Sequence, residues 1–146
     1  MAYLNYKQKK GVLTMNNLFT MNDITSQFDP QEAQDGKALG ILSYLIGLFV
    51  LIPYFTEKKN SWVRFHAVQA LNLYIICAAA TIAISILTSI FGLIPYIGIV
   101  FTILLGIVGF AVSICTFILI VLGIIHTAKG QAVEFPVIKN IKIIKK

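Results

Sequence analysis

Three long apolar segments without Asp, Glu, Lys or Arg constrain the fold of this chain more than any other feature. They cover residues 38–55, 67–91 and 97–125. A helix rises about 1.5 Å per residue, so each segment is long enough to cross about 30 Å of hydrocarbon. The sequence therefore predicts an all-α membrane protein with three transmembrane helices.

The two connections between these segments differ in character. Residues 56–66 contain several charged side chains and are typical of a hydrophilic loop. Residues 92–96 carry no charge, but Gly92 and Pro95 disfavour a continuous helix. We therefore expect the second and third segments to form a tight hairpin.

The expected hairpin register pairs Cys77 with Cys115 and His66 with His126. We interpret the cysteines as buried free thiols, with a disulfide as the alternative. Two histidines with no further ligand at suitable spacing make a poor metal site. The sequence predicts no metal and no other cofactor.

The distribution of charge predicts the orientation. The net charge of +6 falls in residues 56–66 and 129–146, while the charges before the first segment cancel. By the positive-inside rule, the N-terminus lies outside and the C-terminus lies in the cytoplasm. We expect a multi-pass protein of the bacterial cell (inner) membrane.

The same features divide the chain into three parts. We expect a flexible N-terminal tail over residues 1–36, a three-helix transmembrane domain over residues 37–128 and a basic cytoplasmic segment over residues 129–146. Hydrophobic residues make up 58% of the chain and charged residues 12%, which excludes an ordinary soluble surface.

The basic residues lie at the ends of the apolar segments, where lipid headgroups lie. This placement favours anionic lipids as partners and predicts no binding of nucleic acid. In the C-terminal segment, isoleucines alternate with lysines in a way that predicts a short amphipathic helix in the membrane interface, with an unordered tail as the alternative. The candidate headgroup ligands are Lys58, Lys59, Lys139, Lys142, Lys145 and Lys146.

The start of the second apolar segment holds most of the polar residues. Trp62 suits the membrane interface, where Arg64 and His66 can reach lipid headgroups. For Arg64 we favour the alternative, a bidentate contact with a carboxylate or with the C-terminal end of a helix in this protein or a partner. Gln69 and Asn72 lie deeper and share one helix face, so they need partners on another helix. We expect hydrogen bonds to Tyr44 or Ser43, and the alternative is a polar strip that lines a path for a solute or a translocated segment.

Each predicted span also has two small residues four positions apart. Such pairs let helix backbones approach closely. We interpret them as packing positions within one bundle, with contact between copies in a homo-oligomer as the alternative. The pairs are Ser43 and Gly47, Ala79 and Ala83, and Gly109 and Ser113.

Two short motifs resemble a known family. The first motif is Val-Arg-Phe-His-Ala-Val-Gln-Ala at residues 63–70, and the second is Lys129-Gly130 followed by Phe135-Pro136-Val137. Both are similar to motifs of the small membrane subunit of the chloroplast inner-envelope protein translocon and its bacterial relatives. The resemblance covers residues 38–144, although the chloroplast members have a further span before these three. The motif and interaction candidates are Arg64, Phe65, His66, Ala67, Gln69, Asn72, Lys129, Gly130 and Pro136.

Motifs of catalysis do not occur in the sequence. It has no glycine-rich phosphate loop, no Gly-x-Ser-x-Gly, no His-Glu-x-x-His and no carboxylate within the apolar segments. We predict a structural or interaction protein rather than an enzyme. The resemblance implies a translocon-like component that assists protein insertion or transport, with a membrane-protein partner or a second copy. The alternative is an oligomeric channel or carrier for a small solute.

Overall fold

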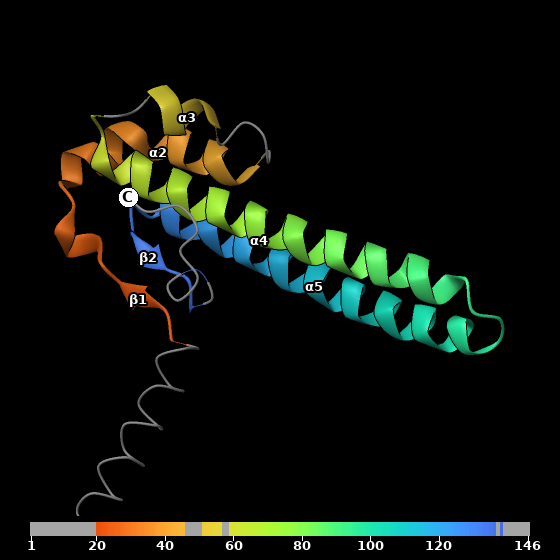
Figure 1. Cartoon of the computed structure of the whole chain (residues 1–146). Helices are drawn as coiled ribbons and strands as arrows, with labels where there is room; N and C mark the ends of the chain where they lie inside the picture. The colour runs from red at the N-terminus through yellow and green to blue at the C-terminus, as the bar shows by residue number, and fades with distance from the viewer. Residues whose placement is uncertain (1–19, 46–50, 57–58, 137, 139–146) are drawn as a thin grey trace, which may run out of the picture.

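The computed structural model of the chain describes residues 20–45, 51–56, 59–136 and 138, and these are mostly helical. Helices α4 and α5 form a long antiparallel hairpin, and the shorter elements gather at the end where α4 begins and α5 ends (Figure 1). In chain order the elements are β1 (Asn22–Asp23), η1 (Thr25–Gln27), α2 (Pro30–Leu45), α3 (Leu51–Thr56), α4 (Ser61–Gly92), α5 (Ile97–Ala128) and β2 (Val133–Glu134).

The hairpin follows the predicted register. Near its turn the rings of Phe91 and Phe101 stack with centroids 4.5 Å apart. Halfway along, Thr116 Oγ1 lies 3.6 Å from Cys77 Sγ, while its hydrogen goes to the Val112 carbonyl at 2.9 Å. Both contacts lie within one residue of the expected pairing. Cys77 and Cys115 are free thiols, as predicted, although Cys115 is exposed and Cys77 is half-buried.

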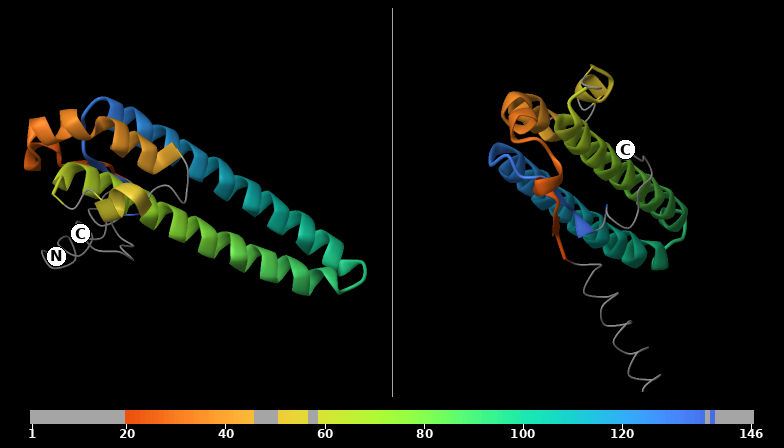
Figure 2. Two further views of the ribbon diagram at one scale, coloured as in Figure 1. Left: turned by 90° about the horizontal axis from the view of Figure 1, so that it is seen from above. Right: turned by 90° about the vertical axis from the view of Figure 1, so that its left-hand side faces the viewer.

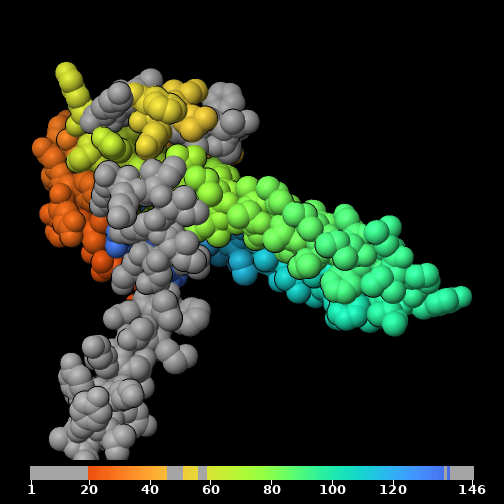
Figure 3. Space-filling model, viewed as in Figure 1, coloured from red at the N-terminus to blue at the C-terminus, as the bar shows by residue number. Residues whose placement is uncertain are grey.

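The two ends of the hairpin are surrounded differently. We call residues 20–45, 51–56, 59–73, 119–136 and 138 the base, and residues 74–118 the stem. The stem projects from the wider base as a bare pair of helices (Figures 2 and 3). In the most apolar 18-residue window of α4, and in that of α5, only 6% is buried. Both helices are long and apolar enough to cross a membrane, and neither is covered like the core helix of a soluble protein.

Helix α2 runs along the first turns of α4 in the same direction. Its Gly36 lies against Val63, and further along its Tyr44 lies against Gln69. By Asn60 the chain has returned to the start of α2, as shown by the bond from Asn60 Nδ2 to the Glu32 carbonyl at 3.0 Å. The predicted first span, residues 38–55, therefore corresponds to the second part of α2 and to α3. A third transmembrane helix is not confirmed.

A short sheet joins the two ends of the described chain. β1 pairs antiparallel with β2, with Asn22 opposite Glu134 and Asp23 opposite Val133. The predicted orientation puts the N-terminal segment and the C-terminal segment on opposite sides of a membrane. It is not confirmed, because these strands are hydrogen-bonded at one end of the hairpin.

Part of the predicted tail of residues 1–36 also lies in described elements, namely β1, η1 and the first turns of α2. The predicted C-terminal amphipathic helix falls almost entirely outside the described residues, as do Lys58 and the lysines of that segment. Ile138, the one described residue beyond Pro136, is buried in the base against the cluster that contains Tyr44 and Phe135.

Candidate functional site

The start of α4 is enclosed by α2 and by the end of α5. A side chain at Gly36 of α2 would collide with Val63, and a Cβ at Gly40 would lie 2.6 Å from Thr127 Cγ2 and 3.0 Å from Trp62 Cζ3. These two glycines therefore allow α2 to approach both long helices. Trp62, which we expected at the membrane interface, is instead 0% exposed.

Gln69 connects three elements within the base. Its Nε2 donates to Tyr44 Oη at 3.0 Å and to the Val133 carbonyl at 2.9 Å. The predicted bond between Gln69 and Tyr44 is confirmed. Asn72 Nδ2 donates to the Val68 carbonyl of its own helix at 2.9 Å. A single amide therefore joins α4 to α2 and to β2.

His66 lies at the centre of a polar cluster that also contains Tyr44, Gln69 and Thr127. It is 1% exposed, so the expectation that it reaches lipid headgroups is wrong. Its Nδ1 lies 3.2 Å from Thr127 Oγ1 and 3.4 Å from Tyr44 Oη. The Thr127 hydroxyl donates its one hydrogen to the Gly123 carbonyl at 2.6 Å. Nδ1 therefore either donates to Thr127 Oγ1 or accepts from Tyr44 Oη, whose hydroxyl itself accepts from Gln69 Nε2.

Aromatic rings and one hydroxyl complete the cluster. The rings of Trp62 and His66 meet edge to face with centroids 4.4 Å apart. Tyr74 Oη donates to the Tyr44 carbonyl at 2.6 Å. This carbonyl belongs to the last turn of α2, where carbonyls lack partners within the helix. The polar groups of the base thus bond mainly to one another.

The structure brings the two predicted motifs together, because Ala67 of the first and Phe135 of the second lie in one buried cluster. Phe65 packs against Phe28 with ring centroids 5.4 Å apart, and Ala67 is fully buried. Arg64 is half-buried, and its Nε has no hydrogen-bond partner among the described residues.

The second motif lies directly opposite. Gly130, with a φ of +73°, ends α5 by donating its N–H to the Thr127 carbonyl at 3.0 Å. Lys129 beside it is exposed, and Pro136 follows β2 at the edge of the base core. Of the predicted headgroup ligands, only Lys59 is described, and it is exposed.

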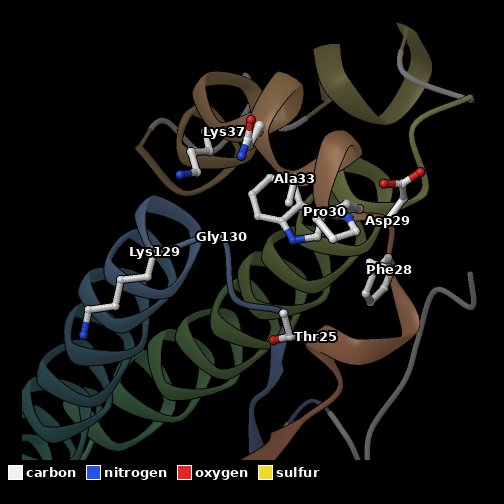
Figure 4. A pocket seen from close by; sticks show the side chains of 10 residues that line it. Thr25, Phe28, Asp29, Pro30, Ala33, Lys37, Lys129 and Gly130 are labelled. Carbon is white, nitrogen blue, oxygen red and sulfur yellow. The ribbon is translucent and has the colours of Figure 1, made fainter.

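A cavity of about 210 Å³ lies beside Trp62, between α2, the turn after η1 and the turn after α5. Figure 4 shows Lys37 and Lys129 on the side of Gly130, and Asp29 on the opposite side next to Phe28. Among the residues that the structure describes, no three His, Cys, Asp or Glu side chains form a metal-binding group.

Sequence reasoning missed Thr127, the Val133 carbonyl and this cavity. A usable signal was present in the small residues four positions apart in α2 and α5, at Gly36 and Gly40 and at Gly123 and Thr127. The pairs in α2 and α5 lie where these helices contact their neighbours in the base, whereas the predicted packing pair Ala79 and Ala83 is exposed on the stem.

Comparison with known proteins identifies a different family from the one suggested by the motifs. The model of the magnetosome magnetite crystal formation protein family matches residues 35–144, which is more than half of the chain. No curated protein and no solved structure matches. Nothing in this match supports kinship with the chloroplast translocon. The predicted role in protein insertion or transport is wrong, because the matching family is one of magnetite crystal formation.

Proposed function

The chain belongs to the magnetosome magnetite crystal formation protein family, and on this basis we propose that it acts in magnetite crystal formation as a structural protein of the membrane. The observation that carries the proposal is the stem, whose apolar helices α4 and α5 are only 6% buried in their most apolar windows. Such a surface fits hydrocarbon rather than water. Most buried polar side chains of the base bond to one another, with Trp62 Nε1 and His66 Nε2 as exceptions, which supports a structural role rather than a catalytic one.

The length of the stem supports two membrane crossings. The part of α4 beyond the base, from Tyr74 to Gly92, is about 28 Å long at 1.5 Å per residue, close to the hydrocarbon thickness of about 30 Å. The facing part of α5 has a similar length. The base then lies at one membrane surface, with the turn after Gly92 at the other.

The proposed arrangement makes α2 and α3 a hairpin that folds back within the base, instead of a third span. From Gly36 to Leu45, α2 extends about 14 Å along α4. Backbone groups at such a reversal need partners within the protein, and the Tyr74 hydroxyl supplies one to the Tyr44 carbonyl. β1, Asn60 and β2 would all face the same side.

The charge distribution supports a cytoplasmic base in a multi-pass protein of the bacterial inner membrane. The described cations Lys37, Lys59, Arg64 and Lys129 all belong to the base, and the turn at residues 92–96 has none. The positive-inside rule places the basic side in the cytoplasm, next to anionic lipid headgroups.

Cysteine labelling tests this arrangement. In a variant lacking Cys77 and Cys115, single changes Asp35→Cys, Lys59→Cys and Glu134→Cys should react with an impermeant thiol reagent only after the cells are opened. Tyr96→Cys should react in intact cells. Reaction of Asp35→Cys from outside, together with protection of Glu134→Cys, would restore three spans with the N-terminus outside.

Crystal formation itself tests the function. In a magnetite-forming bacterium that lacks its own member of this family, expression of the chain should restore crystal size, measured by electron microscopy. The matched negative is Ile107→Lys, which places a charge in the middle of the stem. Correct membrane insertion without any change in crystal number, size or shape would contradict the proposed function.

A further inference from the structure

The cavity beside Trp62 contains a hydrogen-bond donor without an acceptor. Trp62 lines the cavity and is fully buried, and its Nε1 has no partner among the described residues. The six-membered ring of the indole lies against α2, with Cζ3 3.0 Å from the position of a Cβ on Gly40. Nε1 is on the other edge of the indole and is therefore turned away from this contact.

Two cations border the same space. Lys37 is half-buried, and its Nζ lies 4.0 Å from the position of a Cβ on Gly130. Lys129, the neighbour of Gly130, also lines the cavity. Within the described part of the chain, neither ammonium group has an ion pair or a hydrogen bond to a side chain. The lining carboxylate, that of Asp29, lies on the far side and accepts the Gln31 N–H at 2.8 Å (Figure 4).

These groups define the chemistry of a ligand. An indole N–H and two ammonium groups can only donate hydrogen bonds, so their natural partner is a group that only accepts and carries negative charge. The cavity of about 210 Å³ equals the volume of about seven liquid water molecules, which leaves room for a tetrahedral oxyanion. We propose that this cavity binds a phosphate group through Lys37 and the Trp62 indole, with Lys129 as a further cation at its border.

The phosphate has two sources with the same chemistry, a phospholipid headgroup and free inorganic phosphate. The position of the base at a membrane surface favours the headgroup, and this choice of source alone rests on the proposed membrane arrangement. Phosphate binding can be measured on detergent-solubilised protein without reference to topology or to crystal formation. Failure of the site and failure of the proposed function are therefore distinguishable.

Trp62 is the single tryptophan of the chain, so its fluorescence reports on the cavity directly. The protein in nonionic detergent is titrated with dioctanoyl phosphatidylglycerol, dioctanoylglycerol, inorganic phosphate, or sodium chloride at matched ionic strength. We expect a saturable change with the phospholipid and none with dioctanoylglycerol or sodium chloride. Saturation by inorganic phosphate at equal or lower concentration would also support the site but assign it to free phosphate.

Variants separate this site from general charge attraction. Lys37→Gln should weaken binding about tenfold, as expected for the loss of one charged hydrogen bond. The matched control Lys59→Gln removes the same charge from an exposed position outside the cavity lining, so it should leave the Trp62 titration unchanged even though Lys59 is a candidate for general headgroup contact. Trp62→Phe keeps an aromatic ring but removes the donor, so phosphate should raise its unfolding temperature less than that of the parent.

Two results would overturn the proposal. One is the absence of a saturable change with every phosphate compound. The other is equal affinity of the parent and Lys37→Gln, because binding would then depend on surface charge or detergent exchange rather than on this cavity.

Discussion

The base and the stem are made largely from the same two helices, yet they satisfy their polar groups in opposite ways. In the base, polar side chains bond between elements, as Gln69 does to Tyr44 and Val133. In the stem, serine and threonine hydroxyls bond to carbonyls of their own helix, as Ser113 does to the Gly109 carbonyl at 2.9 Å. Hydroxyls bonded in this way leave the surface of a helix apolar.

This difference indicates a division of labour within one hairpin. The stem has an apolar outer surface and little packing, which suits a lipid environment but gives it little specificity. The base has buried glycine contacts and a connected polar cluster, which fix one arrangement of α2, α4, α5 and the sheet. The same type of change should therefore have opposite consequences in the two regions.

A charge provides the strongest test of the difference. Ile107 is 60% exposed near the middle of the stem. Ile107→Lys should oppose membrane insertion by about 2.5–3.5 kcal/mol, as a lysine at the centre of a transmembrane helix does. The matched control Gln27→Lys places the same charge on an exposed residue of the base and should have no effect. The measurement is the fraction of the chain that is retained in membranes after alkaline extraction. Full retention of both variants would show that the stem does not lie in the hydrocarbon.

Glycine to alanine changes in α5 provide the second test. A Cβ at Gly123 would lie 2.5 Å from Tyr44 Cε1, whereas a Cβ at Gly106 would meet no atom within 4 Å. Gly123→Ala should lower the free energy of unfolding by about 1–3 kcal/mol through overpacking. Gly106→Ala should raise it by about 0.5–1 kcal/mol, because alanine is the better helix former. Thermal unfolding in detergent compares the two, and equal shifts would show that the base is not tightly packed.

The same contrast explains which features could be predicted from the sequence. Uninterrupted apolar runs with helix-breaking residues at Gly92 and Pro95 determine a hairpin and its register locally, so both were predictable. The bond between Gln69 and Tyr44 was also predictable, because a buried amide needs a partner at its own depth.

The return of the chain after α2 was not predictable from hydropathy. An apolar segment of 18 residues that crosses a membrane has the same composition as one that folds back beside other helices. What decides between them is long-range packing, namely the contact of Gly36 and Gly40 with α4 and α5 and the pairing of β1 with β2. Two-residue strands have no pattern of their own, so the pairing that joins the two ends of the described chain could not be predicted from the sequence.

Removal of one amide tests the polar cluster of the base. Gln69→Leu leaves the Val133 carbonyl and Tyr44 Oη without their donor. We expect a loss of about 1 kcal/mol in unfolding free energy, within the range for buried groups left unpaired. Ser113→Ala, which removes a bond within the helix of the stem, should change stability by less than about 0.5 kcal/mol. If both variants unfold like the parent, the cluster does not hold the base together.

The smallest expected effect concerns the edge of the base, at Asp23. The Thr25 hydroxyl and the Thr25 backbone N–H donate to its carboxylate, and both bonds lower the pKa of Asp23 below its ordinary value. Thr25 Oγ1 in turn accepts the Ala132 N–H at 2.9 Å. The ionised carboxylate thus orients the hydroxyl that holds the two ends of the described chain together.

The sign of the pH dependence follows from this lowered pKa. The contribution of Asp23 is fully present above the ordinary pKa of an aspartate and is lost as the pH falls through the lower pKa of the folded protein. The Ile24 amide, which donates to the Ala132 carbonyl at 2.9 Å, should therefore exchange with deuterium faster at acidic pH, after correction for intrinsic rates. Asp23→Asn should show the faster exchange already at neutral pH, and amides of the stem should show no such step. Unchanged protection of Ile24 in Asp23→Asn would mean that β1 is held to the base by backbone pairing alone.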